Sequence, residues 1–290
     1  MPDMDKQTVV LCPNPYKDKG LELTSRVRRE LEGAGFEVKV SPEYLDGDLL
    51  LPTDGWDFCT LEDEADSARL VVSLGGDGTI MHTARRLIGH PVPIIGVNLG
   101  TIGFLTELER GDMERLTAAA RGCYTLSPRM MLKVELERGG EIIFSDYALN
   151  DVALRGIAQT IHMLARGDGR RMLEFSGDGL VVATPTGSTA YSMAAGGPLV
   201  EPTAENLILT PICSHVLAVR SFVLAPERVV TVDINCIRGA DAIISVDGGR
   251  FDVRDGDVLH VRKSRHQTLL AHVGSKAFYD IVFEKLGERK

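Results

Sequence analysis

The chain has 290 residues, and 30 of them are glycine, about 10% against a typical share of roughly 7%. A hydrophobic fraction of 44% and a charged fraction of 25% exclude an intrinsically disordered chain, and the glycines follow no collagen-like repeat. A net charge of −9 argues against a protein that binds nucleic acids through a basic face. Anionic small ligands remain possible, because backbone N–H groups and a metal ion can hold them in a pocket.

The five cysteines are scattered along the chain and form no C-x-x-C pair. This pattern predicts buried or free thiols in a reducing compartment. No apolar run reaches the roughly 18 residues that a membrane span needs, and residues 1–8 lack the apolar core of a signal peptide. We therefore expect a cytoplasmic protein with neither a membrane nor a nucleic-acid partner.

Strands and helices are predicted to alternate in the first domain, residues 1–125. Each apolar run is followed by turn residues or a helical pattern, which is typical of parallel βαβ units covered on both faces. The expected strands are Thr8–Cys12, Phe36–Val40, Arg69–Leu74 and Pro93–Val97, and the expected helices lie within 21–34 and 80–88. We predict an α/β domain with a parallel sheet.

Short β-rich segments separated by Gly, Asp and Arg turn residues follow in the second domain, residues 126–266, and predict an all-β, antiparallel domain. They include 131–136, 141–145, 147–154, 161–165, 171–176, 180–184, 221–224, 229–236, 242–246, 250–253 and 258–261. The last segment, 267–290, contains a predicted helix over Phe278–Leu286. We expect this segment to return to the first domain and the helix to pack there.

A glycine motif, Gly75-Gly76-Asp77-Gly78-Thr79, lies at a predicted strand-to-helix turn. Glycines permit close backbone approach to a ligand, and a helix N-terminus supplies N–H donors and partial positive charge for a phosphate. The alternative interpretation is an ordinary turn in which Asp77 caps the helix. The motif matches neither a Walker A loop nor a Rossmann fingerprint.

Two further segments carry candidate site residues. The next strand ends in a glycine loop, Asn98–Thr106, and the carboxyl ends of neighbouring parallel strands share one crevice. Asn150-Asp151 interrupts an apolar strand-like run, and an Asn amide can recognise an adenine edge through paired hydrogen bonds. Tight turns or a bulge are the structural alternatives at these places.

A long hydroxyl- and glycine-rich run, 176–198, begins with Asp178 at an acidic turn and continues through Thr184-Pro-Thr-Gly-Ser-Thr-Ala-Tyr-Ser192. Its hydroxyls and backbone N–H groups suit ribose and phosphate. In order and spacing, the four motifs together resemble those of bacterial NAD kinases over residues 8–285. The run 184–192 is the most specific part, because the Gly-Gly-Asp-Gly element also occurs in lipid kinases and phosphofructokinase-like enzymes.

The resemblance implies a two-domain enzyme that transfers the γ-phosphoryl group of ATP to the 2′-hydroxyl of the adenosine ribose of NAD, with a divalent metal, Mg²⁺, as cofactor. It implies Asp77 as general base and a homodimer or homotetramer. The implied NAD-binding residues are Asp77, Gly78, His82, Asn150, Asp151, His162, Asp178, Thr189, Ala190, Tyr191 and Ser192, and the implied phosphate loop is Gly75, Gly76, Gly78 and Thr79. The metal ligands remain unknown.

Some positions depart from the family pattern: Ser176, Ala194 and Gly249 replace frequent basic, Ser and Gln residues, and Asp151 replaces a frequent Glu. They affect secondary contacts and substrate preference. Two alternatives stay open, a lipid or sugar kinase that shares the glycine motif and a non-catalytic nucleotide sensor. His90, His215, His260, His266 and His272 lack metal-ligand spacing, which favours structural or surface roles.

Overall fold

The structure is a computed structural model that describes residues 7–43, 55–100, 103–157, 159–216, 219–235, 241–274 and 277–287. The chain divides into two compact units. The first comprises Met1–Pro128 and Thr268–Lys290, and the second comprises Arg129–Gln267. Cys236 and two residues of the predicted second glycine loop, Thr101 and Ile102, lie outside the described residues.

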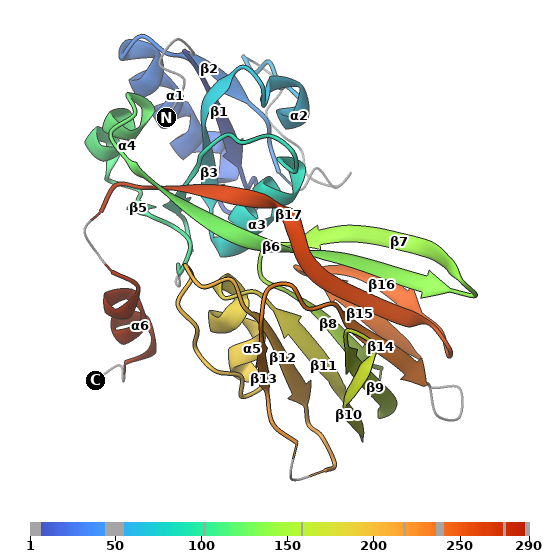
Figure 1. The fold of residues 1–290 in the computed structure, drawn as a ribbon. Coiled ribbons are helices and arrows are strands. Elements are labelled where there is room, and N and C mark those ends of the chain that lie inside the picture. Colours follow the sequence, from blue (N-terminus) through green and yellow to red (C-terminus); the bar gives the residue numbers. More distant parts are fainter. Residues whose placement is uncertain are drawn as a thin grey trace. The chain divides into compact units, whose positions relative to one another are not determined.

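The first unit is built on a parallel sheet (Figure 1). Its strands run in the order β2-β1-β3-β4, with β5 and the end of β17 also paired to β4 in parallel. The bounds are β1 Thr8–Pro13, β2 Glu37–Val40, β3 Ala68–Gly75, β4 Ile94–Asn98, β5 Leu108–Glu109 and β17 Val258–His272. The helices are η1 Lys19–Leu21, α1 Glu22–Gly33, α2 Leu61–Glu64, α3 Asp77–Arg86, α4 Met113–Ala120 and α6 Phe278–Leu286.

Burial explains this sheet. Every residue of β1, β3 and β4 is buried, as expected for parallel strands covered on both faces. Helix α1 buries a stripe of Thr24, Val27 and Leu31, whose spacing of three and four residues is that of one helix face. The predicted α/β fold with a mostly parallel sheet is confirmed. Helix α6 contains no buried residue, so its packing on the first domain stays a prediction.

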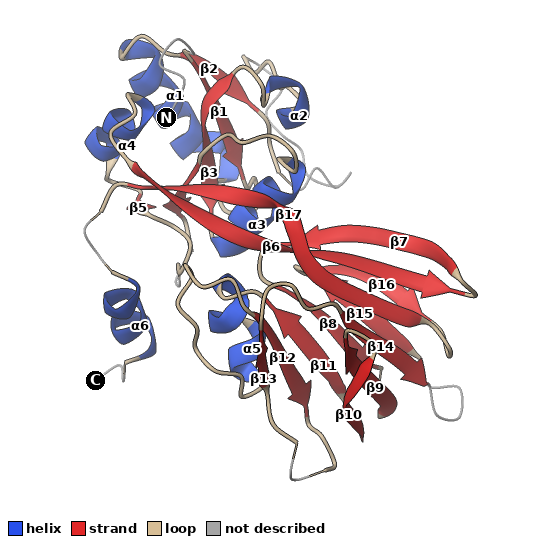
Figure 2. Ribbon diagram, viewed as in Figure 1, coloured by secondary structure: helices blue, strands red, loops and turns tan. Residues whose placement is uncertain are grey.

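The second unit is β-rich, as predicted, and its strands pair antiparallel (Figure 2). One group pairs in the order β10-β9-β14-β17, and a second sheet runs β13-β12-β11-β8-β15-β16. The bounds are β6 Thr125–Arg138, β7 Glu141–Ala148, β8 Asp151–Gly156, β9 Ile161–Gly167, β10 Arg170–Gly177, β11 Gly179–Ala183, β12 Leu207–Ile212, β13 Phe222–Leu224, β14 Val230–Asn235, β15 Ala242–Val246 and β16 Gly249–Val253. Two short helices, η2 Thr186–Thr189 and α5 Tyr191–Ala194, follow β11.

Three sequence-based expectations for this unit were wrong in detail. The expected strand 147–154 is broken at Leu149 and Asn150, because their N–H groups bond to the Asp247 carboxylate instead of a strand. Strand β12 was not predicted. Strand β17 extends to His272 and contains the basic cluster Arg262–His266, where a short strand ending at residue 261 was expected.

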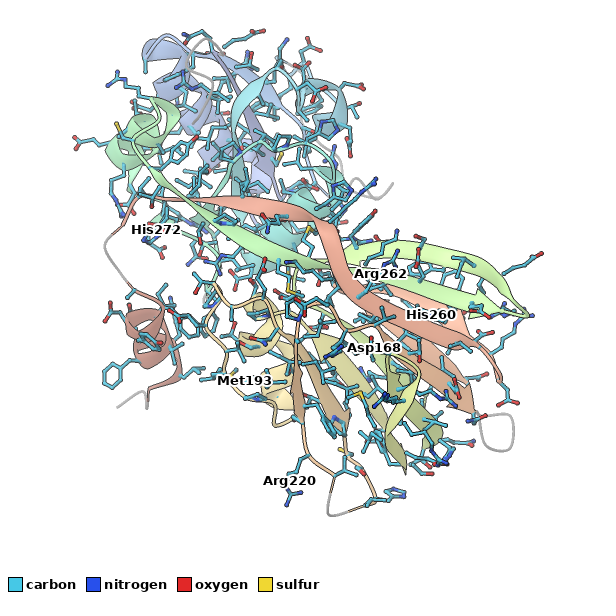
Figure 3. All side chains as sticks on the ribbon, in the orientation of Figure 1. Asp168, Met193, Arg220, His260, Arg262 and His272 are labelled. Atoms are coloured by element: carbon cyan, nitrogen blue, oxygen red, sulfur yellow. The ribbon has the colours of Figure 1, made fainter. Side chains whose placement is uncertain are left out.

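Three histidines outside the predicted site contact carboxylates, which supports their structural interpretation. His260 Nε2 lies 2.8 Å from Glu137 Oε2 and His272 Nδ1 lies 2.7 Å from Glu107 Oε2; Figure 3 labels both histidines. His90 Nδ1 lies 2.8 Å from Asp66 Oδ1. The four cysteines within the described residues are free, and no helix in this part of the chain is long and apolar enough to cross a membrane.

Candidate active site

The glycine motif forms the turn from β3 into α3. Gly76 precedes the helix, and Thr79 Oγ1 accepts its N–H group at 3.3 Å, which caps the first turn. A Cβ atom on Gly75 would lie 2.1 Å from Thr79 Oγ1, so Gly75 is required by this packing. Asn14 Nδ2 donates to the same hydroxyl at 3.2 Å, and Thr79 is buried. Thr79 thus serves the cap, while Gly78 is exposed.

Asp77 is the first residue of α3, and its carboxylate is oriented by the second glycine loop. Oδ2 accepts the N–H group of Phe104 at 2.9 Å, and Oδ1 accepts that of Leu105 at 3.0 Å. Burial raises the pKa of Asp77, although these N–H donors and the nearby Lys17 oppose the rise. A half-buried carboxylate held in one orientation, with a raised pKa, has the properties of a general base.

A lysine that the sequence analysis did not select lies beside this turn. Lys17 Nζ is so close to Gly76 that a Cβ atom there would lie 2.7 Å from it. The ammonium group therefore adds positive charge where the N–H groups of α3 already favour an anion. A side chain at position 76 would displace the ammonium group from this place.

His82 lies one turn along α3 and contacts a buried carboxylate. Its Nδ1 is hydrogen-bonded to Glu43, a residue with no exposed surface. Glu43 also accepts from the Thr83 hydroxyl at 3.0 Å and lies 3.3 Å from the Arg86 guanidinium. One side chain from the segment after β2 thus binds three residues of α3. The sequence carried no local signal for Glu43, because its partners lie 39 or more residues away.

Asn98 begins the second glycine loop and has a structural role there. Its Oδ1 accepts the N–H group of Gly100 at 2.9 Å, and its Nδ2 lies 3.2 Å from Glu109 Oε1. Gly103 is required by packing, since a Cβ atom would lie 2.0 Å from Thr106 Oγ1. The described part of this loop therefore owes its shape to internal contacts, and it presents its N–H groups to Asp77.

In the second unit, Asn150 and Asp151 lie at the start of β8. The Asn150 backbone is held at its carbonyl by the N–H group of Thr184 at 2.8 Å, and a Cβ atom on Gly187 would lie 2.1 Å from that same carbonyl oxygen. Burial, and after it the charge of Asp247, raises the pKa of Asp151 to about 7. The Tyr191 N–H group bonds to the Asp151 carboxylate and opposes the rise.

The hydroxyl-rich run follows β11 and wraps back toward Asn150. Thr184 Oγ1 donates to the Leu149 carbonyl at 2.6 Å, and Thr189 Oγ1 donates to the Thr186 carbonyl at 3.2 Å. Ser192 is fully buried with its hydroxyl 3.1 Å from that of Thr210, which is a packing contact. The Thr186 hydroxyl is buried and has no hydrogen-bond partner within the described residues, so a ligand or water can satisfy it.

Within this run, Ala190 links η2 to α5, and Tyr191 begins α5. The Tyr191 ring lies 5.8 Å from the Arg155 guanidinium, a cation–π arrangement. The hydrogen bond from the Tyr191 N–H group to the Asp151 carboxylate places Tyr191 beside Asp151 and its neighbour Asn150.

Asp178 lies at the opposite end of β11. Since β11 and β8 pair along their length, Asp178 and Asp151 are separated by about 16 Å, five residues at roughly 3.3 Å each. The His162 ring lies 3.3 Å from the Ser176 hydroxyl, two residues before Asp178. The Cys213 thiol hydrogen-bonds to Asp178, which raises the pKa of that thiol. The predicted NAD-binding residues of this unit therefore form two groups, one at each end of β11.

Asp77, Gly78 and His82 belong to the first unit, and the two groups beside β11 belong to the second. The described residues contain no group of three or more His, Cys, Asp or Glu side chains able to hold a metal ion. A protein cage for Mg²⁺ is therefore absent from this part of the chain. Mg²⁺ commonly binds through substrate phosphates and few protein ligands.

Comparison with known proteins identifies the family. Residues 9–125 match the model of the ATP-NAD kinase N-terminal domain, and residues 127–273 match that of the ATP-NAD kinase C-terminal domain. The chain belongs to the NAD kinase family of enzymes. The NAD kinase of Ruminiclostridium cellulolyticum is 36% identical over 281 residues, which cover 96% of each chain. That of Geotalea daltonii is 40% identical over 79% of this chain and 82% of its own.

Solved structures support the same fold. A crystal structure of yeast NADH kinase complexed with NADH superimposes with a TM-score of 0.85 at 24% identity, over 98% of this chain and 88% of that one. An NAD kinase from Archaeoglobus fulgidus in complex with ATP has a TM-score of 0.74 at 25% identity, over 96% of this chain and 98% of that one. The family resemblance read from the motifs is thus confirmed.

Proposed function

We propose that this enzyme transfers the γ-phosphoryl group of ATP to the 2′-hydroxyl of the adenosine ribose of NAD, giving NADP and ADP, with Asp77 as general base. The observation that carries the proposal is the Asp77 carboxylate at the N-terminus of α3, oriented by two backbone N–H groups and with a raised pKa. Family membership supports the choice of NAD and ATP as substrates.

The chemistry requires a base because a ribose hydroxyl is a poor nucleophile at neutral pH. Asp77 accepts the hydroxyl proton as the ribose oxygen bonds to the γ-phosphorus and the bond from that phosphorus to the ADP oxygen breaks. Lys17 and the N-terminus of α3, with its partial positive charge, bind phosphate oxygens beside Gly76. Mg²⁺, when bound to the phosphates of ATP, offsets their charge.

In the second unit, Asn150 and Asp151 bind the adenine and ribose at one end of β11, together with Thr189, Ala190 and Tyr191. Asp178 and His162 bind the nicotinamide half at the other end. The separation of about 16 Å along β11 supports an extended dinucleotide, because one compact group cannot reach both ends. Ser192 acts indirectly, by packing α5 against the Thr210 hydroxyl.

The deciding experiment is a coupled assay for NADP, run with ATP or polyphosphate as donor and NAD or NADH as acceptor, with ADP release measured in parallel. We expect NADP with ATP and NAD. ADP release with a lipid or sugar but not with NAD would support the kinase alternative, and nucleotide binding without turnover would support the sensor. Sedimentation analysis tests the proposed homodimer or homotetramer.

A further inference from the structure

The turn between β15 and β16 contains an aspartate whose side chain the turn itself does not need. Asp247 and Gly248 form a two-residue hairpin loop with φ of 46° and 90°, the left-handed conformations of a type I′ turn. Asn or Gly would satisfy these angles equally well. The Asp247 carboxylate instead reaches the segment between β7 and β8, about 97 residues earlier in the chain.

There the carboxylate accepts three successive backbone N–H groups. Oδ2 accepts that of Leu149 at 2.6 Å, and Oδ1 accepts those of Asn150 and Asp151, each at 3.0 Å. Successive N–H groups that converge in this way form an anion-binding concavity, and here a side chain of the protein fills it. The Asp247 N–H group also donates to the Asp151 carbonyl at 3.1 Å. Asp247 therefore bonds to N–H groups and to a carbonyl group of this segment.

The opposite edge of the same segment is held by β11 and the loop after it. Thr184 donates its hydroxyl to the Leu149 carbonyl at 2.6 Å and its N–H group to the Asn150 carbonyl at 2.8 Å. The N–H groups of Leu149 and Asn150 therefore bond to Asp247 and their carbonyls bond to Thr184. Without Asp247, three buried or half-buried N–H donors would lose their acceptor, although the carbonyl contacts would remain.

We propose that Asp247 is a positioning residue of the nucleotide-binding site, and that it fixes the backbone from which Asn150 and Asp151 present their side chains to the acceptor nucleotide. This inference rests on the proposed function. Charge-assisted hydrogen bonds to backbone N–H groups are among the stronger ones, so a single side chain is sufficient to select this conformation. The placement of a binding amide within tenths of an ångström depends on such support.

Asp247 also acts on Asp151 through its charge. The charge that acts on Asp151 is that of Asp247 from the β15–β16 turn; from α5 the backbone N–H group of Tyr191 bonds to its carboxylate, and β11 presents Ala183 opposite. The Asp247 oxygens accept three N–H groups, and after burial its charge is the second cause that raises the pKa of Asp151. Near neutral pH a protonated Asp151 can donate a hydrogen bond to a ligand oxygen, which a carboxylate cannot do.

The test compares two variants with a control in the same hairpin. Asp247→Gly keeps the turn and removes the carboxylate, and Asp247→Asn keeps the turn but removes the charge and replaces one of the two acceptor oxygens by an NH2 group. For both we expect the KM for NAD to rise about tenfold or more while the KM for ATP stays unchanged. Asp252→Asn, an exposed carboxylate on β16 that pairs with Arg250, should leave both constants unchanged.

Two readouts separate positioning from a general loss of folding. Formate should lower the raised KM of Asp247→Gly, because it can occupy the vacated concavity, and it should have no such effect on Asp252→Asn. In Asp247→Asn, the alkaline side of the pH profile of kcat/KM for NAD should move to lower pH, because the neighbouring charge that raises the pKa of Asp151 is gone and Asp151 loses its proton earlier. If both variants keep the wild-type KM for NAD, the positioning role is wrong.

The proposal can fail independently of the proposed function. Amide hydrogen exchange at Leu149, Asn150 and Asp151 is slow in the wild-type protein if Asp247 holds them, and we expect it to accelerate at least about tenfold in Asp247→Gly. This measurement involves no reaction. Unchanged exchange overturns the positioning role even where the wild-type enzyme forms NADP, and accelerated exchange supports it even where the enzyme uses another acceptor.

Discussion

The Asp77 carboxylate and the Leu105 backbone N–H group are joined by a hydrogen bond of 3.0 Å. It connects the first residue of α3 with the loop after β4, and the Phe104 N–H group makes a second bond to the other oxygen. The proposed base is thus also an acceptor for the loop beside it. Its orientation is set before any nucleotide binds, so its contribution to turnover and its contribution to loop structure can be separated experimentally.

For Asp77→Asn we expect turnover to fall by at least about 10²-fold while NAD still binds, because the amide cannot accept the ribose proton. The amide oxygen can still accept one of the two loop N–H groups. Steady-state kinetics and direct NAD titration measure the two effects. A near-wild-type kcat would eliminate Asp77 as the base. Loss of NAD binding together with kcat would indicate that its contacts with the loop are the main role.

Asp151→Asn should change how stability depends on pH. Because the pKa of Asp151 is raised to about 7 in the folded protein from 3.8, the folded state keeps a proton that the unfolded state releases. The stability from this group is therefore complete below about pH 4 and is lost as the pH rises toward 7. The variant does not titrate, so its stability relative to wild type should grow with pH, by at most about 1.4 kcal/mol per pH unit.

Urea unfolding of both proteins at pH 5, 6, 7 and 8 measures this difference. Other titrating groups affect both proteins alike, so only the gap between the two curves carries the contribution of Asp151. A gap that does not change with pH would contradict the raised pKa.

Glu43→Gln should strongly destabilise the first unit. Glu43 has no exposed surface, and removal of one partner from a buried ion pair commonly costs about 3–5 kcal/mol. Glu62→Gln is the matched control, because Glu62 contacts the same Arg86 guanidinium from the solvent side with 42% of its side chain exposed. Its loss should cost about 0–1 kcal/mol. If urea unfolding shows equal losses of unfolding free energy for the two variants, the buried Glu43 contributes no more to stability than the exposed Glu62.

Gly187→Ala should destabilise the second unit and weaken NAD binding together. The new methyl group would lie 2.1 Å from the Asn150 carbonyl oxygen, a backbone atom, so the segment between β7 and β8 must move. Overpacking of this kind typically costs about 1–3 kcal/mol. Gly33→Ala in α1, where no atom lies within 4 Å of the new methyl group, should be stabilising by up to about 1 kcal/mol. A thermal unfolding midpoint for Gly187→Ala at or above that of Gly33→Ala would refute this packing argument.

The α/β fold of the first unit was predictable because its sequence signals are local. The apolar run 69–74, the glycines after it and the helical spacing from Ile80 are contiguous in the chain, and they form β3, the turn and α3 as expected. The hydroxyl-rich run after β11 was found for the same reason. Local periodicity failed at Leu149 and Asn150, where an apolar pattern indicated a continuous strand that is interrupted in the fold.

The sequence by itself determined the family, the two kinds of domain and the segments that carry the candidate site, because each depends on residues adjacent in the chain. Only the tertiary structure decided which side chains hold those segments in place. Glu43 contacts α3 from 39 residues away, and Asp247 bonds to Leu149 across 98. Such contacts form when distant segments pack together, and no short-range pattern encodes them. The structure also gives a reason for some of the many glycines: Gly75, Gly103 and Gly187 are required because a Cβ atom there would collide with neighbouring atoms.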